Sequence, residues 1–356
     1  MSGKVSYPMI DCHVHVWGGI SEIDGLIEIA DAVGLRAQAV MCIAACGYEG
    51  IGPLQTPLGL LFKAMHPERI FCFGALNYLA PNAKESGDVL AGQARRMIEA
   101  GADGIKMLEG KPVFRKAIGL PLDSAKYDAF FECVQSSGTP LLYHVADPER
   151  LWDPAQASEG GRKSRWFYGD GTYASKVQLY REAEGFLVKF PALRVVFAHF
   201  FFMSADLQRA ARVLDTYPGV NFDLTPGREM YTNFRKDLAA WRDFFIKYQD
   251  RILFGTDSSG GNGGYDAGRV KECQGKVAWM RQFLETENDG INLPPDVLEK
   301  TYAGNFQRLV SSSPKPLNLE LALGICEEAL AVAKAAAQPE AEVLEETVGK
   351  MRDLSG

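Results

Sequence analysis

Residues 9–15 read MIDCHVH, a short apolar run that ends in two histidines separated by one residue. Alternate residues of a β-strand point to the same face, so His13 and His15 can offer two imidazoles to one ion. The same alternation places Asp11 on the histidine face, where it can orient a ligand imidazole, and Cys12 on the opposite face, toward surrounding helices. The stretch predicts a buried strand with metal ligands at its C-terminal end.

Three other apolar runs end in the same kind of residue. TPLLYH (139–144) ends in His144, RVVFAH (194–199) ends in His199, and RILFGTD (251–257) ends in Asp257. Each run is typical of a strand buried on both faces. A single histidine after such a run is most often a hydrogen-bonded structural residue, and we assign no chemistry to His66, which lies in a polar turn. The coincidence of several such ends predicts a metal site.

Strand-like and helix-like patterns alternate along the chain with a spacing of about 30 residues, as βα units require. Eight such units predict an α/β fold of the (β/α)8 TIM-barrel type, whose active site gathers at the C-terminal ends of the strands. We expect the barrel to span residues 1–310, and the Ala/Glu/Leu-rich tail at 311–356 to form a C-terminal helical extension. The expected strands are Met9–Asp11, Ala39–Ile43, Ile70–Leu76, Gly104–Leu108, Pro140–Tyr143, Arg194–Ala198, Val220–Leu224 and Ile252–Gly255.

The composition narrows the class of partner. A net charge of -7, without a cluster of lysines and arginines, argues against a nucleic-acid surface. No apolar run approaches the ~18 residues that span a bilayer, and the N-terminus lacks the apolar core of a signal peptide. The seven cysteines are scattered and form no Cys-x-x-Cys pair, so neither a disulfide framework nor a thiolate zinc site is indicated. We expect a cytoplasmic protein that acts on a small molecule, and a homo-oligomer is compatible with the sequence.

Two segments outside the strands carry candidate substrate contacts. The long loop after His144 contains Trp152 and Arg165, a combination suited to an anionic or aromatic ligand, although a solvated loop with anchoring aromatic residues explains it equally well. Arg228, after the seventh strand, is a candidate for a substrate carboxylate, and a structural salt bridge is the alternative.

The ordered set of HVH, two single histidines and a late aspartate resembles the amidohydrolase superfamily. The resemblance is closer to its amidohydrolase-2 branch, which includes enzymes like aminocarboxymuconate-semialdehyde decarboxylase. It runs from about Tyr7 to Val310, and GADGIKM (101–107), ILFGTD (252–257) and YAGNFQRL (302–309) support it. It implies a barrel enzyme with a metal centre.

In that branch the matched positions imply specific roles. His13, His15, His144 and Asp257 would hold one divalent ion, most often zinc, with manganese or another divalent ion as alternatives. His199 would transfer or stabilise a proton beside it. Three imidazoles and one carboxylate suit Zn²⁺, and Asp257 can also accept a proton from a bound water.

Lys106, in the fourth strand, has two interpretations. Binuclear members of the superfamily use a carboxylated lysine there as a bridge between two metals. In GIKML the lysine is not clearly the last strand residue, so an amine near the site or facing the substrate is the alternative.

Three functions fit this set. The first is a metal-dependent hydrolase that uses an activated water on a C–O or C–N bond of a small, carboxylated or cyclic substrate. The second is a non-oxidative decarboxylase of a small aromatic or unsaturated acid, which would use the same ligands. The third is a non-catalytic binding barrel, which a missing ligand would favour, and none is missing. We favour the hydrolase.

Overall fold

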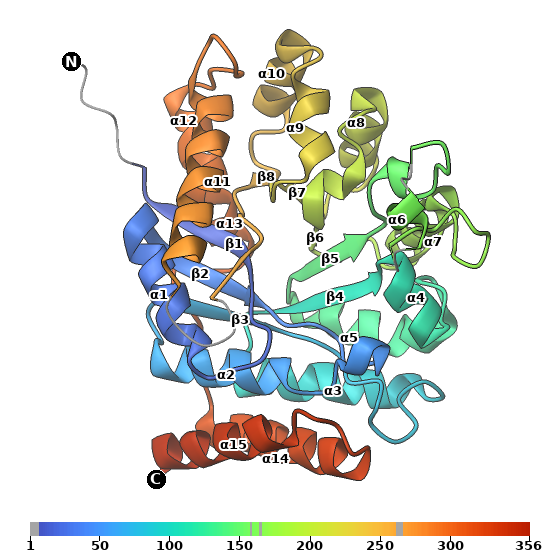
Figure 1. Ribbon diagram of the computed structural model, residues 1–356, viewed down its shortest axis with the longest axis vertical. Helices are drawn as coiled ribbons and strands as arrows, with labels where there is room; N and C mark the ends of the chain where they lie inside the picture. The colour runs from blue at the N-terminus through green and yellow to red at the C-terminus, as the bar shows by residue number, and fades with distance from the viewer. Residues whose placement is uncertain (1–6, 157–158, 164–165, 261–265) are drawn as a thin grey trace.

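A computed structural model describes residues 7–156, 159–163, 166–260 and 266–356. The strands in these residues are β1 (Met9–His15), β2 (Leu35–Met41), β3 (Ile70–Gly74), β4 (Gly104–Gly110), β5 (Leu141–Val145), β6 (Val195–Phe197), β7 (Val220–Asp223), β8 (Ile252–Leu253) and β9 (Ser258–Ser259). They form one parallel sheet in the order β8-β7-β6-β5-β4-β3-β2-β1-β9 (Figure 1). The strand order follows the chain, as a barrel requires.

The sheet closes on itself through the last strand. β8 and β9 are two pieces of one short segment, and β9 pairs in parallel with β1 through Val14 opposite Ser258. Between the two pieces, the backbone N–H of Cys12 donates to Phe254 O at 3.0 Å, and that of Asp257 donates to His13 O at 2.9 Å. The predicted α/β barrel is therefore confirmed, and its eighth strand is interrupted where Asp257 lies.

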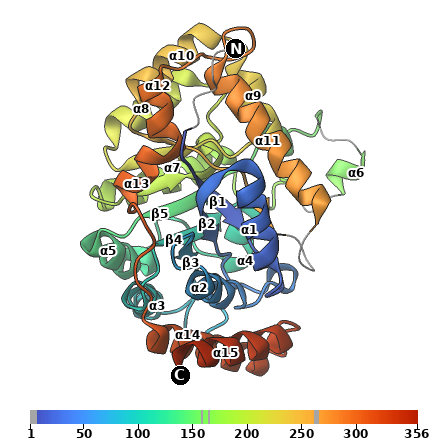
Figure 2. The same ribbon diagram turned by 90° about the vertical axis from the view of Figure 1, so that its left-hand side faces the viewer.

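Helices surround the sheet (Figures 1 and 2). They are α1 (Glu22–Val33), α2 (Gln55–Met65), α3 (Gly87–Ala100), α4 (Pro112–Ile118), α5 (Asp128–Ser137), α6 (Glu159–Arg162), α7 (Lys176–Lys189), α8 (Leu207–Thr216), α9 (Arg228–Phe234), α10 (Leu238–Lys247), α11 (Ala267–Glu285), α12 (Pro295–Glu299), α13 (Asn305–Leu309), α14 (Leu319–Ala335) and α15 (Ala341–Ser355). Short 3-10 helices are η1 (Tyr48–Gly50), η2 (Ala125–Tyr127), η3 (Glu149–Leu151) and η4 (Ala198–Phe202), and η5 (Lys300–Gly304) is a π-helical segment. Among the described helices, none is long and apolar enough to cross a membrane.

The C-terminal region is helical, as predicted. The helices α14 and α15 pair with each other and lie against α2 and α3, at the bottom of Figure 1. Cys326 of α14 and Met351 of α15 are fully buried in the same apolar cluster as Leu58 and Phe62 of α2. Their burial fixes the extension to the outside of the barrel. A domain boundary at residue 310 stays a prediction.

The strands alternate between the barrel interior and the helical layer. Ile105 and Met107 of β4 pack in the large outer cluster, whereas Leu142, Val196 and Leu253 from three other strands meet inside the barrel. The interior cluster is closed by α13, whose Phe306 packs edge-on against Phe71 at 4.9 Å between ring centroids. Apolar side chains thus fill the floor of the barrel, and polar side chains are left for the opposite end.

The first strand departs from simple alternation. Its pairing with β2 shifts register between Asp11 and Val14, which is the mark of a bulge. As a result Cys12 lies in the interior cluster, and its neighbour His13 also faces inward. The prediction that Cys12 points toward the surrounding helices is wrong, because a regular period of two was assumed across the bulge.

Candidate metal centre

Three of the predicted ligands meet at the C-terminal end of the barrel. The Nε2 atoms of His13 and His15 lie 3.1 Å apart. An Oδ1 atom of Asp257 lies 3.3 Å from Nε2 of His15 and 3.8 Å from Nε2 of His13. One ligand atom from each residue lies within 4.8 Å of the others. The two histidines are buried, and the side chain of Asp257 is 35% exposed, so the cluster opens outward on the aspartate side.

The second nitrogen of each imidazole is fixed by a hydrogen bond. Nδ1 of His15 lies 2.9 Å from the backbone carbonyl of Met41, and Nδ1 of His13 lies 2.9 Å from Oδ2 of Asp223. A carbonyl oxygen and a carboxylate can only accept, so both Nδ1 atoms carry the proton. Both Nε2 atoms therefore present lone pairs to each other, an arrangement that a cation between them stabilises.

The spacing also fits a metal ion. Two nitrogens that are each about 2.0–2.1 Å from a tetrahedral Zn²⁺ lie about 3.3 Å apart. The observed 3.1 Å between the Nε2 atoms of His13 and His15 is close to this value. The donor set, two imidazoles and one carboxylate, is one that zinc and similar divalent ions accept.

Asp223, at the end of β7, supports this arrangement. It is fully buried and accepts hydrogen bonds from the ring of His13, from the backbone N–H of His199 at 2.7 Å, and from the hydroxyl of Thr225. Burial opposes ionisation, but the bond from His13 and the nearby histidines lower the pKa of Asp223 to about 2. Asp223, rather than Asp11, therefore orients a ligand imidazole. Asp11 instead accepts from Thr256 at 2.5 Å and from the backbone N–H of His13.

The position of the Asp257 carboxylate depends on an unusual backbone conformation. Its φ of 54° is in the left-handed region, which costs a non-glycine residue about 1–2 kcal/mol. Although burial opposes ionisation, the position of Asp257 beside His15, His199 and His13 lowers its pKa well below the ordinary value. The interruption of the last strand thus places an anionic carboxylate opposite the two imidazoles.

Lys106 lies in the middle of β4 and points into the barrel. It is fully buried, and its Nζ atom is 3.1 Å from Nε2 of His13. Burial lowers its pKa to about 8, against the opposing attraction of Asp223 and Asp257. The amine is therefore next to a predicted ligand. This position is compatible with both interpretations of Lys106, a carboxylated bridge between two metals and an amine near the site.

His199 follows β6 on a strained turn. Residues His199, Phe200, Phe201 and Phe202 all have φ between 49° and 56°. Aromatic packing holds this left-handed turn, since the ring of Phe201 stacks on that of Phe197 at 3.8 Å and Tyr180 donates to Phe201 O. The imidazole of His199 lies 5.6 Å from that of His13 between ring centroids. Strain of this kind is concentrated at functional sites.

His144 is turned toward a different partner. Its ring centroid lies 5.0 Å from that of His199, but its Nε2 lies 3.2 Å from Oδ1 of Asp147. Among the residues that the structure describes, the group close enough to share an ion contains His13, His15 and Asp257 without His144. Burial is the main cause that lowers the pKa of His144 to about 3. His144 is thus a neutral imidazole at the rim of the cluster, and its role as a fourth ligand stays a prediction.

The predicted substrate residues have different positions. The indole N–H of Trp152 donates to Ala174 O at 3.1 Å, and its ring packs against Tyr168, so it anchors the long loop. Arg165 lies outside the described residues, as does the side chain of Arg228, whose backbone begins α9.

Trp17, which was not among the residues predicted from the sequence, lies beside the centre. Its side chain is 44% exposed, and its ring lies 5.5 Å from that of His15. The buried carboxylate of Glu22 accepts the backbone N–H groups of Trp17, Gly18 and Gly19 and so fixes this turn. The alternation of side chains along a strand, continued beyond His15, predicts that Trp17 lies on the same face.

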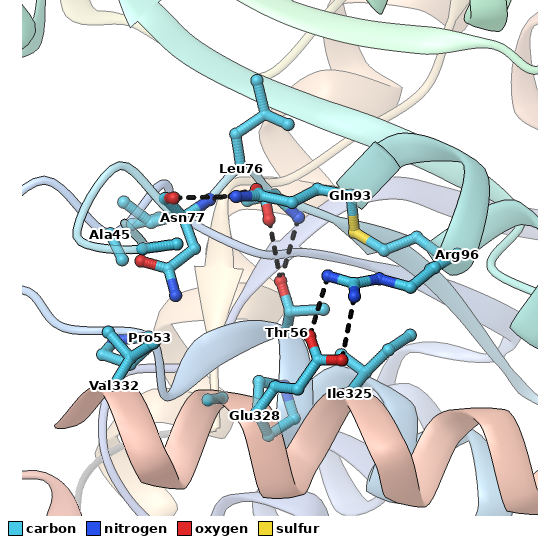
Figure 3. Close-up of a pocket in the computed structure, with 16 residues that line it drawn as sticks. Ala45, Pro53, Thr56, Leu76, Asn77, Gln93, Arg96, Ile325, Glu328 and Val332 are labelled. Atoms are coloured by element: carbon cyan, nitrogen blue, oxygen red, sulfur yellow. Dashed lines mark hydrogen bonds and ion pairs between the residues drawn. The ribbon is translucent and has the colours of Figure 1, made fainter. Parts of the chain in front are cut away.

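A separate pocket lies outside the barrel, between α2, α3 and α14 (Figure 3). Its polar side chains are paired with one another or with the backbone. Arg96 forms an ion pair with Glu328, and Gln93 bonds to the backbone of Asn77. None of the predicted site residues lines this pocket. It lies where α14 packs against α2 and α3.

The sequence model of one family, described as amidohydrolase, matches residues 60–310, which is more than half of the chain. The chain belongs to the amidohydrolase family. It is therefore an enzyme of a family that acts on small molecules. The match begins after β1, so His13 and His15 lie outside the matched residues.

Solved structures share the fold of this amidohydrolase. 5-Carboxyvanillate decarboxylase from Sphingomonas paucimobilis is 15% identical, covers 86% of this chain and 99% of its own, and has a TM-score of 0.53. A 2,6-dihydroxybenzoate decarboxylase is 14% identical, with coverage of 86% and 98% and a TM-score of 0.54. 4-Oxalomesaconate hydratase from Rhodopseudomonas palustris is 13% identical, with coverage of 92% and 99% and a TM-score of 0.52. A comparison with curated protein sequences gives no significant match.

Proposed function

We propose that this amidohydrolase is a metal-dependent hydrolase, in which His13, His15 and Asp257 hold one divalent ion. The observation that carries the proposal is the convergence of two imidazole lone pairs and one ionised carboxylate within 4.8 Å. Zinc is the ion that this donor set favours, and manganese is the main alternative. His144 is retained as the fourth protein ligand.

When bound, the ion lowers the pKa of a coordinated water to about 7 and polarises a substrate carbonyl. The side chains around it would carry out the proton transfers and the positioning. Asp257 is ionised and partly exposed, so it can accept a proton from the attacking water. That proton then has to reach the leaving group, and His199, held on its strained turn beside His13, can take it up at Nε2 and pass it on. Asp223 keeps the ring of His13 in one orientation throughout. This division serves cleavage of a C–O or C–N bond, such as that of a lactone, ester or amide.

A second candidate is a non-oxidative decarboxylase of a small aromatic or unsaturated acid. One observation favours it: Trp17 exposes nearly half of its side chain beside His15, a position suited to a planar ligand. Two relatives of the same fold are decarboxylases of aromatic acids, according to their names. In this reaction His199 would deliver the proton to carbon as CO2 leaves. The hydrolase remains the first choice because every matched residue has a role in it.

Metal content tests the common part of the proposal. Protein purified from metal-supplemented medium should contain about one divalent ion per chain, because the donor set forms a single site. His13→Ala should remove most of it while the barrel stays folded, as circular dichroism and thermal melting would show. His66→Ala, which changes a histidine far from the cluster, is the matched control. Full metal content in His13→Ala would overturn the proposal.

The reaction class is tested on the metal-loaded enzyme. A panel of small lactones, esters and amides should give acid products by chromatography, whereas a panel of hydroxylated aromatic acids should give no CO2. CO2 release without a new acid group would replace the hydrolase with the decarboxylase.

A further inference from the structure

A buried polar cluster joins His144 to the long loop that follows it. Asp147 lies at the centre of this cluster, and its two carboxylate oxygens contact the side chains of the other members. Both oxygens accept from Nζ of Lys111 at 2.9 Å, and Oδ2 also accepts from the hydroxyl of Tyr168 at 2.6 Å. Oδ1 lies 3.2 Å from Nε2 of His144. Lys111 follows β4, His144 belongs to β5, and Tyr168 comes from the loop, so three segments meet at one carboxylate.

The partners of Asp147 decide which nitrogen of His144 carries the proton. Asp147 is buried beside a lysine ammonium and a phenol that both donate to it. A carboxylate in this setting stays ionised and can only accept, so Nε2 of His144 must be the donor. The lone pair of His144 is then on Nδ1.

This assignment is opposite to that of the other site histidines. His13 and His15 carry the proton on Nδ1, because that atom bonds to Asp223 and to Met41 O. His199 does the same, since its Nδ1 lies 3.2 Å from the carbonyl of Thr225. The basic nitrogen is thus Nε2 in these three imidazoles, with Nε2 of His13 and of His15 3.1 Å apart, whereas His144 has Nδ1 as its only basic nitrogen.

We propose that Asp147 is a positioning residue that holds His144 in the Nε2–H tautomer, so that His144 acts on the ion or substrate through Nδ1. Tyr168 makes this position depend on the long loop. Its ring packs against Trp152 and Tyr173 of the same loop, and its backbone N–H donates to Leu151 O. The loop and the imidazole of His144 are therefore linked through Tyr168 and Asp147. The role of Nδ1 rests on the proposed metal site, but the tautomer does not.

The tautomer can be measured on the metal-free protein. The chain has five histidines, so long-range ¹H–¹⁵N correlation spectra of ¹⁵N-histidine-labelled protein at pH 8 are simple enough to assign with single histidine variants. We expect His144 to show the Nε2–H pattern, and His13 and His15 to show the Nδ1–H pattern. The Nδ1–H pattern at His144 would overturn the proposal, whatever the metal analysis gives.

Variants then test the cause. Asp147→Ala should give a mixture of tautomers at His144, and it should weaken zinc binding about 10–100-fold, as loss of such partners usually does. Tyr168→Phe keeps the ring packing, removes one donor and should shift the His144 signals in the same direction, which tests the idea even if Asp147→Ala folds poorly. Asp170→Ala changes an exposed acid in the same loop that bonds to Thr172, and it should alter neither readout. An unchanged His144 tautomer in both Asp147→Ala and Tyr168→Phe would refute the positioning role, whereas metal loss in His13→Ala is judged separately.

Discussion

Nδ1 of His13 lies 2.9 Å from Oδ2 of Asp223, and this contact links the first strand of the barrel to the seventh. The same carboxylate accepts the backbone N–H of His199. One buried aspartate thus sets the direction of a predicted metal ligand and the start of the turn that carries His199, the proposed proton-transfer residue. Partners of this kind are expected to matter nearly as much as the ligands themselves.

Replacing this carboxylate should weaken metal binding. Asp223→Asn keeps the shape of the side chain but can present an N–H group to His13, which favours the wrong tautomer. We expect zinc affinity to fall about 10–100-fold, measured by competition with a chelator. Asp215→Asn, an exposed aspartate in α8, is the control. Equal affinity in the two variants would contradict the assigned role of Asp223.

His199 should contribute to the rate and not to metal retention. We expect His199→Ala to keep near-full metal content and to lose about 10²–10⁴-fold in turnover, the usual range for a general acid–base group. Metal content, melting temperature and rate are measured on the same preparation. A variant that is active but less stable would make His199 a structural residue.

Gly255 should be sensitive to any added side chain. A Cβ atom there would lie 2.9 Å from Cγ2 of Thr225, 3.1 Å from Sγ of Cys12 and 3.2 Å from Cβ of His13. Gly255→Ala should therefore cost about 1–3 kcal/mol in the free energy of unfolding and displace His13, with loss of metal affinity. Cys12→Ala, which removes one of these contacts, should restore part of both in the double variant. Wild-type stability and metal affinity in Gly255→Ala would show that the packing around Cys12 is looser than described.

Glu109 should make stability depend on pH. It is buried in β4, Oε1 accepts from Tyr78 at 2.8 Å, and Oε2 has no hydrogen-bond partner among the described residues. Burial raises the pKa of Glu109 to about 7. Since the folded state holds this proton more tightly than the unfolded state, the stabilisation is complete below about pH 4 and is lost as pH rises to about 7.

Glu109→Gln should remove that dependence. Relative to the variant, the wild-type protein should lose up to about 3 kcal/mol of unfolding free energy between pH 5 and pH 8. Urea denaturation at both pH values measures the difference. Glu68→Gln, at an exposed position, should track the wild-type protein. A constant difference between Glu109→Gln and wild type across this range would mean that Glu109 is ionised throughout.

The sequence was sufficient for the barrel because its strands are buried on both faces and read as short apolar runs. It was also sufficient to predict that His13, His15 and Asp257 lie close together, because parallel strands end at the same edge of the sheet. It was not sufficient for Cys12, since a bulge in β1 has no sequence signature as clear as alternation. Asp147 and Asp223 were not predicted as hydrogen-bond partners of the histidines. Side-chain pairs between strands depend on the strand register and on the rotamers, and neither can be derived from a single sequence.

The position of the ligands along the chain has a consequence for biosynthesis. His13 and His15 leave the ribosome about 240 residues before Asp257, which belongs to the segment that closes the barrel against β1. A nascent or truncated chain that lacks this segment carries the three proposed histidine ligands but not the carboxylate of Asp257. The proposed ion would therefore be acquired late, after closure, and would not accompany incomplete chains. Metal loading would then mark the chains in which the barrel has closed.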